Sequence, residues 1–315
     1  MRPWLFVVVA ACTFSPTAAT TRDDARLADA SDAMPDASRT CIDAWIDPAS
    51  LAFTTPIALA TLNTMGTERD PTLSADELQL WFASTRSGTS QVWTATRPDR
   101  SQPFGAATLD AQASGAPTDQ TGRRYQTMNG QFYGISSLRI GTKGGFDLFI
   151  ATSSGTGFGG PSNGQLSSVD DSSNQYDPWL SDDGKDLYYA LGPSVGVEHV
   201  MRATRADVTL PFDAPVLVSE LELGAVQGDP SLFANEQFIL FSSVNPNNVT
   251  ADHTDIWYAI RAGDGGWQAP RDLPAPINTA SDEGDPWVSP DGCRLYFAAQ
   301  VPGDDYDLFV ANVML

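Results

Sequence analysis

Residues 283–299 read EGDPWVSPDGCRLYFAA, an Asp-Pro pair followed by a Ser-Pro-Asp-Gly turn and an aromatic strand. Three further copies begin at Glu68 (ERDPTLSADELQLWFAS), Gln175 (QYDPWLSDDGKDLYYAL) and Gln227 (QGDPSLFANEQFILFSS), and a worn copy begins at Thr121 (TGRRYQTMNGQFYGIS). The third position of the five copies falls at residues 70, 123, 177, 229 and 285, so the intervals are 53, 54, 52 and 56 residues. A period this regular is the signature of a repeat architecture.

A second short strand follows in each repeat, such as TDIWYAIR from Thr254, and after it comes a Phe or Trp with a proline-containing stretch, such as GWQAPRDL from Gly266. Alternating apolar residues, with Gly, Asp, Asn and Pro at the turns, favour several short antiparallel strands, and no segment has helical periodicity. Four short antiparallel strands in about 50 residues make one blade of a β-propeller. The sequence therefore predicts an all-β fold, a five-bladed β-propeller with about 53 residues per blade.

The last repeat ends at Leu315, directly after its third strand, and lacks the aromatic and proline stretch. The missing piece is found near the start of the chain, where FTTPIALATLN (residues 53–63) matches WQAPRDLPAPIN (residues 267–278). We expect the N-terminal strand to complete the last blade, because this closure removes the free sheet edge of an open ring. The propeller domain is accordingly placed at residues 45–315.

The N-terminal residues MRPWLFVVVAACTF contain one Arg, an apolar run and then Cys12, which is typical of an export signal. Residues 9–12, Val-Ala-Ala-Cys, resemble the lipobox of bacterial lipoproteins, in which the signal (here residues 1–11) is removed and the cysteine receives acyl chains that anchor it to a membrane. The Ala- and Asp-rich residues 12–44 are then a flexible tether. We therefore expect an exported protein, lipid-anchored at the outer membrane or the periplasmic face. The alternative is an ordinary secretory signal with an incidental cysteine.

Two further cysteines, Cys41 and Cys293, remain after Cys12. In an exported protein an even remainder favours a disulfide. Cys41 precedes the closing strand and Cys293 lies in the turn of the last blade, so the bond would lock the ring. A free, buried pair of thiols is the alternative.

The chain is strongly acidic, with 39 Asp and Glu against 18 Lys and Arg and a formal net charge of -21. This charge repels nucleic acid and anionic lipid surfaces, and it favours cations, basic partners or neutral glycans. We therefore expect no nucleic-acid partner, and a membrane association through the lipid anchor alone.

The repeated pattern DPxxSxDGxxLYFAS, followed by GxxDLWxA, resembles the WD40-like β-propeller repeats of the TolB type, as at residues 285–311. That resemblance implies a periplasmic or envelope propeller that serves as a docking or binding scaffold. The sequence departs from the pattern at Arg123-Arg124, which replace Asp-Pro, and at Gln91 and His199, where other repeats have Asp.

The third motif position carries Asp70, Asp177, Asp229 and Asp285, and Arg123 in the worn copy. Equivalent positions of a closed propeller form a ring, so these side chains are candidate binding residues at the mouth of the central channel, for a cation or a basic peptide. The alternative is that each Asp caps its own turn by accepting backbone N–H bonds. Arg123 would interrupt the ring and could pair with a neighbouring Asp.

No cofactor and no metal site is assigned from the sequence. Calcium is an alternative for the loop PGDDYD (residues 302–307), because Asp304, Asp305 and Asp307 are spaced loosely like the ligands of a calcium loop. The loop lacks the Gly and the distal Glu of an EF-hand.

Catalytic motifs are sparse. His199 and His253 lie in different repeats without metal-ligand spacing, and the sequence has no nucleophile elbow or phosphate loop. No catalytic residue is assigned, since the acidic residues follow the repeat, whereas catalytic residues normally differ between blades. We expect a monomeric, non-enzymatic scaffold that binds an envelope protein partner through loops of one face. The alternative is a carbohydrate-binding or glycoside-hydrolysing propeller that uses acidic residues at the channel mouth.

Overall fold

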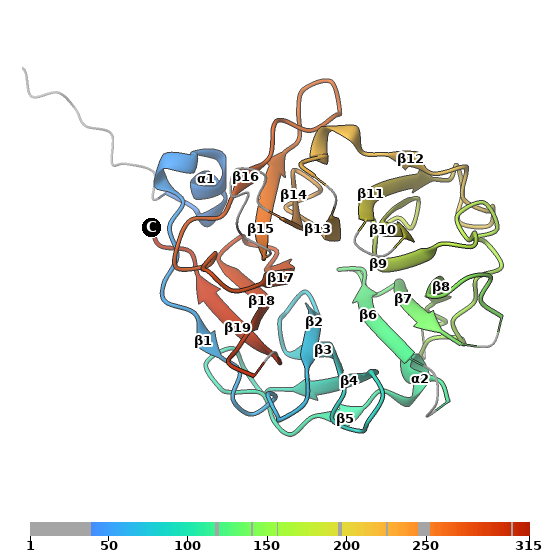
Figure 1. Cartoon of the computed structure of the whole chain (residues 1–315), viewed down its shortest axis with the longest axis horizontal. Helices are drawn as coiled ribbons and strands as arrows, with labels where there is room; N and C mark the ends of the chain where they lie inside the picture. Colours follow the sequence, from blue (N-terminus) through green and yellow to red (C-terminus); the bar gives the residue numbers. More distant parts are fainter. Residues whose placement is uncertain are drawn as a thin grey trace, which may run out of the picture. The chain divides into compact units, whose positions relative to one another are not determined.

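The computed structural model describes residues 39–315, apart from residues 117–119, 140, 156, 195–196, 225, 245–252 and 304. The predictions of a signal peptide, of a lipidated Cys12 and of most of the tether fall on residues outside this part. The described chain forms five antiparallel sheets arranged as a ring around a central channel (Figure 1). The prediction of an all-β, five-bladed propeller is confirmed.

In each blade the inner strand comes first in the sequence and the outer strand last, except in blade 5, whose outer strand comes from the N-terminus. Blade 1 contains β2 (Glu68–Leu73), β3 (Gln79–Ser84), β4 (Gln91–Thr96) and β5 (Thr108–Leu109), and blade 2 contains β6 (Gln120–Gln126), β7 (Phe132–Leu138) and β8 (Asp147–Thr152). Blade 3 contains β9 (Asn174–Leu180), β10 (Asp186–Ser194), β11 (Val197–Thr204) and β12 (Val216–Leu217), and blade 4 contains β13 (Gln227–Phe233), β14 (Phe238–Val244), β15 (Thr254–Ile260) and β16 (Arg271–Asp272). Blade 5 contains β17 (Glu283–Val288), β18 (Arg294–Gln300), β19 (Tyr306–Asn312) and β1 (Ile57–Ala58). The short helices are α1 (Cys41–Ile46), η1 (Pro48–Ser50), α2 (Ala111–Ser114) and η2 (Ser219–Leu221).

The Asp-Pro pair lies at a β-bulge of the inner strand. In β2 the pairing with β3 shifts register between Arg69 and Thr72, and the other inner strands shift at the equivalent place. All four motif aspartates have a φ between 53° and 58°, in the left-handed region that short polar side chains tolerate better than most. The bulge takes Asp out of the ladder and lets Pro follow it without the loss of a ladder hydrogen bond.

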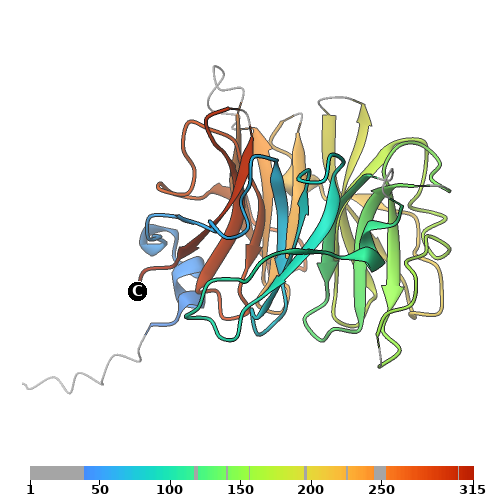
Figure 2. The same ribbon diagram turned by 90° about the horizontal axis from the view of Figure 1, so that it is seen from below.

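The N-terminal segment closes the ring. β1 pairs antiparallel with β19, so the predicted closure of the last blade is confirmed. Cys41 and Cys293 form the predicted disulfide, which joins α1 to the turn of blade 5. Beside it, Trp45 is fully buried and its Nε1–H donates to the carbonyl of Gly292 at 2.8 Å. Figure 2 shows this segment lying against the C-terminal blade.

In three blades, an arginine contacts the Phe or Trp of the repeat, and this contact explains why the aromatic residue recurs. An arginine at the end of the third strand donates its Nε–H to the carbonyl of the inner turn of its own blade. Its guanidinium group also lies over the aromatic ring, Arg97 over Phe104 at 4.4 Å, Arg205 over Phe212 at 4.4 Å and Arg261 over Trp267 at 3.9 Å. The aromatic residue therefore ties the outer part of the blade to its inner hairpin.

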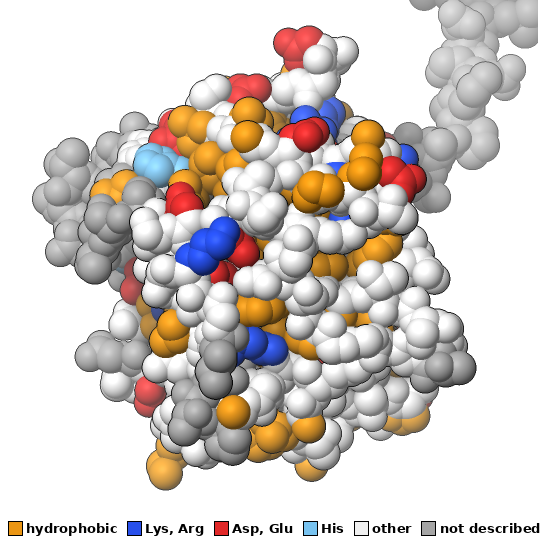
Figure 3. Space-filling view, turned by 90° about the vertical axis from the view of Figure 1, so that its right-hand side faces the viewer, with side chains coloured by type: hydrophobic (Ala, Val, Ile, Leu, Met, Phe, Trp, Pro, Cys, Tyr) orange, Lys and Arg blue, Asp and Glu red, His pale blue; other side chains and the backbone are white. Residues whose placement is uncertain are grey.

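The outer strands β1, β5, β12 and β16 are only two residues long. Such short edges offer little for another chain to pair with. On the side shown in Figure 3, hydrophobic side chains are scattered among polar ones rather than gathered into one patch. No helix in the described part of the chain is long and apolar enough to cross a membrane.

Candidate functional site at the channel mouth

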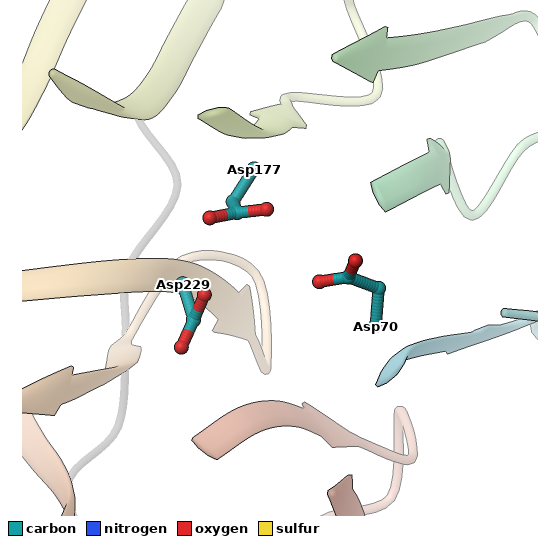
Figure 4. A group of neighbouring side chains, drawn as sticks. All are labelled: Asp70, Asp177 and Asp229. Atoms are coloured by element: carbon teal, nitrogen blue, oxygen red, sulfur yellow. The ribbon is translucent and has the colours of Figure 1, made fainter. Parts of the chain in front are cut away.

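The four motif aspartates meet in the channel. Carboxylate oxygens of Asp70, Asp177 and Asp229, from three different blades, lie within 4.8 Å of one another, and the three side chains surround one space in the channel (Figure 4). Asp229 also accepts a hydrogen bond at 3.2 Å from the backbone N–H of Asp285 in the next blade, rather than from its own turn. We call Asp70, Asp177, Asp229 and Asp285 the aspartate ring.

Arg123 takes the fifth place, at the position equivalent to the aspartates, and its side chain is fully buried. Its Nη2 donates to the carbonyl of Pro286 at 2.8 Å, and its Nη1 donates to the carbonyl of Pro230 at 3.3 Å. The expected pairing with a neighbouring Asp is replaced by these two backbone contacts across the ring. Arg123 acts on the aspartates through its charge, which lowers the pKa values of the ring carboxyls against the effect of burial.

Four buried carboxylates this close together cannot all be ionised. Burial raises the pKa of Asp177 and of Asp285 well above the usual range, and the negative charge of Asp229 adds to the effect. Burial acts on Asp229 in the same direction, but hydrogen bonds from the side chains of Asp177 and Ser242 outweigh it, so the pKa of Asp229 is lowered. Bound protons or a bound cation must therefore neutralise part of the negative charge of the ring, and carboxylate oxygens are suitable ligands for a cation.

A cavity of about 470 Å³ opens at the mouth of the channel, and the aspartate ring forms part of its lining. The second motif position, next to the aspartate, supplies another part of the wall. Three blades have glycine there, at Gly122, Gly228 and Gly284, whereas Arg69 and Tyr176 occupy it in the other two. A Cβ at each of these glycines would lie 2.7–3.2 Å from a neighbouring side chain, that of Ser136, Glu198 or Ser242, so the glycines leave room for those side chains.

The residue before the third-strand Asp also lines the mouth. It differs from blade to blade, as Phe146, Glu198, Thr254 and Tyr306, which line the cavity, and Ser90, which is not part of the lining. Burial raises the pKa of Glu198 to about 7, and the charge of Asp229 contributes. The Oε2 atom of Glu198 lies 3.2 Å from the point that a Cβ on residue 228 would occupy, so a glycine there leaves Glu198 its place.

Glu198 is a candidate functional residue that sequence reasoning missed. The acidic residues considered from the sequence follow the repeat, whereas Glu198 stands at a position that varies between the blades. The signal was present, because the position before the third-strand Asp carries five different residues in the five blades.

Arg69 is the one Arg or Lys among the described residues that line the cavity. Its guanidinium carbon lies 3.5 Å from the ring centroid of Tyr306, and it makes no hydrogen bond or ion pair with the described residues. The hydroxyl of Tyr306 donates to Asp282 Oδ2 at 2.8 Å, and Asp282 Oδ1 accepts from the backbone N–H of Thr254 at 2.7 Å. The aromatic platform under Arg69 is thus held in place, while the donors of the guanidinium group stay available.

The other acidic and histidine residues considered from the sequence do not join this site. Asp147 is fully buried at the start of β8 and accepts from the backbone N–H of Lys143 at 2.8 Å. His199 lies 3.0 Å from Glu222, and the two histidines stand in different blades. The calcium alternative for residues 302–307 includes Asp304, which lies outside the described residues.

The disulfide indicates the kind of compartment in which the protein is located. A bond between Cys41 and Cys293 persists in an oxidising environment, which supports export of the protein. Lipid anchoring at Cys12 stays a prediction.

No protein-family model and no curated protein matches this chain. Solved structures of similar fold include a thermostable family-43 glycoside hydrolase, at 15% identity and a TM-score of 0.53, covering 81% of this chain and 92% of that one. The catalytic domain of the Coprinopsis cinerea GH62 alpha-L-arabinofuranosidase is similar at 11% identity and a TM-score of 0.52, covering 79% and 91%. TolB from Acinetobacter baumannii matches at 10% identity and a TM-score of 0.46, covering 81% of this chain and 56% of that one. At these identities the similarity shows the propeller fold alone.

Proposed function

We propose that the protein binds the end of a carbohydrate chain in the cavity at the mouth of its channel. A volume of about 470 Å³ lies in the range of small-molecule sites rather than of flat protein interfaces. Phe146 and Tyr176 stand in its wall with their ring centroids 5.3 Å apart, and Tyr306 stands in the wall as well. Aromatic walls of this kind suit the C–H faces of a sugar ring.

The polar groups of the cavity suit sugar hydroxyls. Arg69 offers several N–H donors in a fixed plane, and Glu198 and the aspartate ring offer carboxyl groups that accept or donate according to their protonation. The observation that carries the proposal is that Arg69, Tyr176 and Glu198, three residues at positions that vary between the blades, surround one cavity above the ring. Residues at variable positions have no common structural task, so their convergence points to a ligand.

Hydrolysis of the bound carbohydrate is a second candidate function, and a specific observation favours it. The pKa of Glu198 is raised to about 7 by burial, whereas the pKa of Asp229 is lowered by its hydrogen bonds. Glycosidases use such a pair, one carboxyl that is protonated near neutral pH and one that is ionised. The family-43 and GH62 propellers of similar fold agree with this candidate.

The test is a glycan array followed by calorimetry with the purified propeller, and a parallel screen for hydrolysis of aryl-glycosides and oligosaccharides. Tyr176→Ala should weaken binding at least about tenfold, because a stacking face is lost. Glu198→Gln should abolish any hydrolysis while binding persists. Leu210→Ala, at a side chain that is 48% exposed on the outer surface, is the control. Failure of every carbohydrate to bind would refute the proposal.

In that case the scaffold expected from the sequence becomes the next hypothesis. Cross-linking of the protein in intact cell envelopes would then be expected to recover one protein partner bound to loops of one face. The lipid anchor is tested separately, by incorporation of labelled palmitate that is lost in Cys12→Ser.

A further inference from the structure

One buried oxygen of the aspartate ring has no partner among the described residues. Arg123 donates from both of its Nη groups to backbone carbonyls, and Arg69 lies against Tyr306. Asp285 is only 2% exposed, yet its Oδ2 has no hydrogen-bond partner in the described part of the chain. A buried polar oxygen without a partner is costly whether or not the carboxyl is protonated, so it indicates a place for a polar ligand group.

A residue outside the acidic cluster points to the same place. Ser136 is fully buried and belongs to the lining of the cavity, and its Oγ has no partner among the described residues. A Cβ on residue 122 would lie 2.7 Å from this Oγ, so the absence of a side chain at Gly122 is what leaves the hydroxyl room beside the channel. An unpaired hydroxyl and an unpaired carboxyl oxygen in the lining of one cavity indicate a polar ligand group at the ring.

The aspartate oxygens lie close enough together for one kind of donor to reach three of them at once. A primary ammonium group has three N–H donors in tetrahedral directions, and hydrogen bonds of about 2.8 Å place their three acceptors about 4.6 Å apart. The nearest oxygens of Asp70, Asp177 and Asp229 lie within 4.8 Å of one another. We propose that the aspartate ring binds a primary ammonium group of the ligand, so that the carbohydrate carries a free amino group. This inference rests on the proposed carbohydrate-binding function and names its substrate class, an amino sugar.

An organic ammonium group fits the surroundings better than a bare divalent ion. The aromatic walls formed by Tyr176 and Tyr306 border the same cavity, and a sugar attached to the ammonium group would cover them, whereas an ion would leave them bare.

The experiment compares glucosamine oligomers with their N-acetylated counterparts and with neutral oligosaccharides of equal length, by calorimetry on the intact propeller. The free amine should bind at least about tenfold more tightly, because charge-assisted hydrogen bonds are about twice as strong as neutral ones. Asp177→Asn should remove that preference and leave the weaker binding of the neutral sugars. Asp264→Asn, an exposed residue of an outer loop, is the matched control and should keep the preference.

The failures of the two proposals can be told apart. If neutral, acetylated and amino sugars bind equally well, the ammonium site is refuted and the carbohydrate site stands. If no sugar binds, methylammonium tests the ring alone: it should stabilise the protein in thermal unfolding, whereas trimethylammonium, with a single N–H donor, and sodium should not. Equal effects of the three cations, or a calcium ion that binds to the ring and excludes methylammonium, would overturn the inference.

Discussion

Blade 2 and the other four blades differ at one equivalent position, and the difference shows how this propeller divides structure from function. In four blades the bulge turns an aspartate carboxyl into the channel. In blade 2 the longer side chain of Arg123 extends across the ring to the carbonyls of Pro230 and Pro286. The repeated aspartate forms the ring and gives it a negative charge, and Arg123 partly offsets that charge. A departure from the repeat therefore deserves a physical reason of its own, structural or functional.

The largest expected effect follows from removal of Arg123. Arg123→Met leaves two buried carbonyls without donors and four carboxyls without their nearest buried cation, so we expect a loss of about 3–5 kcal/mol in the free energy of unfolding. The loss should be larger at pH 8 than at pH 5, because more of the ring is ionised at pH 8. Urea denaturation at both pH values measures it. Arg69→Met also removes a positive charge that acts on the ring, but it leaves no backbone carbonyl without a donor, so it should cost less than Arg123→Met. Equal losses would contradict the importance of the two carbonyl contacts of Arg123.

A second departure, Cys293 in the turn of blade 5, sharpens the comparison because its role is structural. The double variant Cys41→Ser with Cys293→Ser should lose about 2–4 kcal/mol in the free energy of unfolding, since the disulfide closes a separation of 252 residues. Ligand affinity at the channel mouth should stay within a factor of about two in the folded variant. A large loss of affinity at full folding would show that the closing segment also shapes the site.

Within the ring, the same Asp→Asn substitution should change the stability of the protein in opposite directions at Asp285 and at Asp229. The pKa of Asp285 is raised by burial, so its stabilising contribution is complete below the ordinary Asp pKa and is lost as the pH rises toward its folded pKa. Asp285→Asn should therefore stabilise the protein at pH 8 by about 1 kcal/mol, and by less at pH 4.

The pKa of Asp229 is lowered, so its contribution is present above the ordinary Asp pKa, and Asp229→Asn should destabilise the protein at pH 8. Thermal unfolding of both variants checks the pair. The same sign for both variants at pH 8 would show that the ring titrates as one unit.

The fold could be predicted from the sequence because its signals are local and recur. Asp-Pro, the turn and the aromatic strand each determine the conformation of a few residues of backbone. The number of repeats in the sequence gives the number of blades. The closing strand was found in the same way, since Phe53 and Pro56 match the stretch that the last repeat lacks. The convergence of the aspartates also followed, because ring closure brings equivalent positions together.

The partners of Arg123 could not be predicted in this way. The carbonyls of Pro230 and Pro286 lie 107 and 163 residues away in the sequence, and which of them a side chain reaches depends on the diameter of the closed ring. Carbonyl groups, moreover, carry no signal in the sequence. Glu198 was missed for a different reason, because repeat alignment draws attention to what is common to the blades, and this residue is an exception.

Glu198 should give the smallest change in stability and a clear change in function. Its pKa is raised to about 7 by burial, so the carboxyl favours the folded state fully below the ordinary Glu pKa, and this contribution fades as the pH rises through 7. Glu198→Gln cannot ionise, so the difference in melting temperature between the wild type and the variant should move in favour of the variant from pH 5 to pH 8. Thermal unfolding at a series of pH values measures this crossing, and hydrolysis assays on the same samples show whether the proton that Glu198 holds near neutral pH is used. A pH-independent difference would mean that Glu198 is ionised throughout, and it would rule out Glu198 as the proton donor for a glycosidic oxygen.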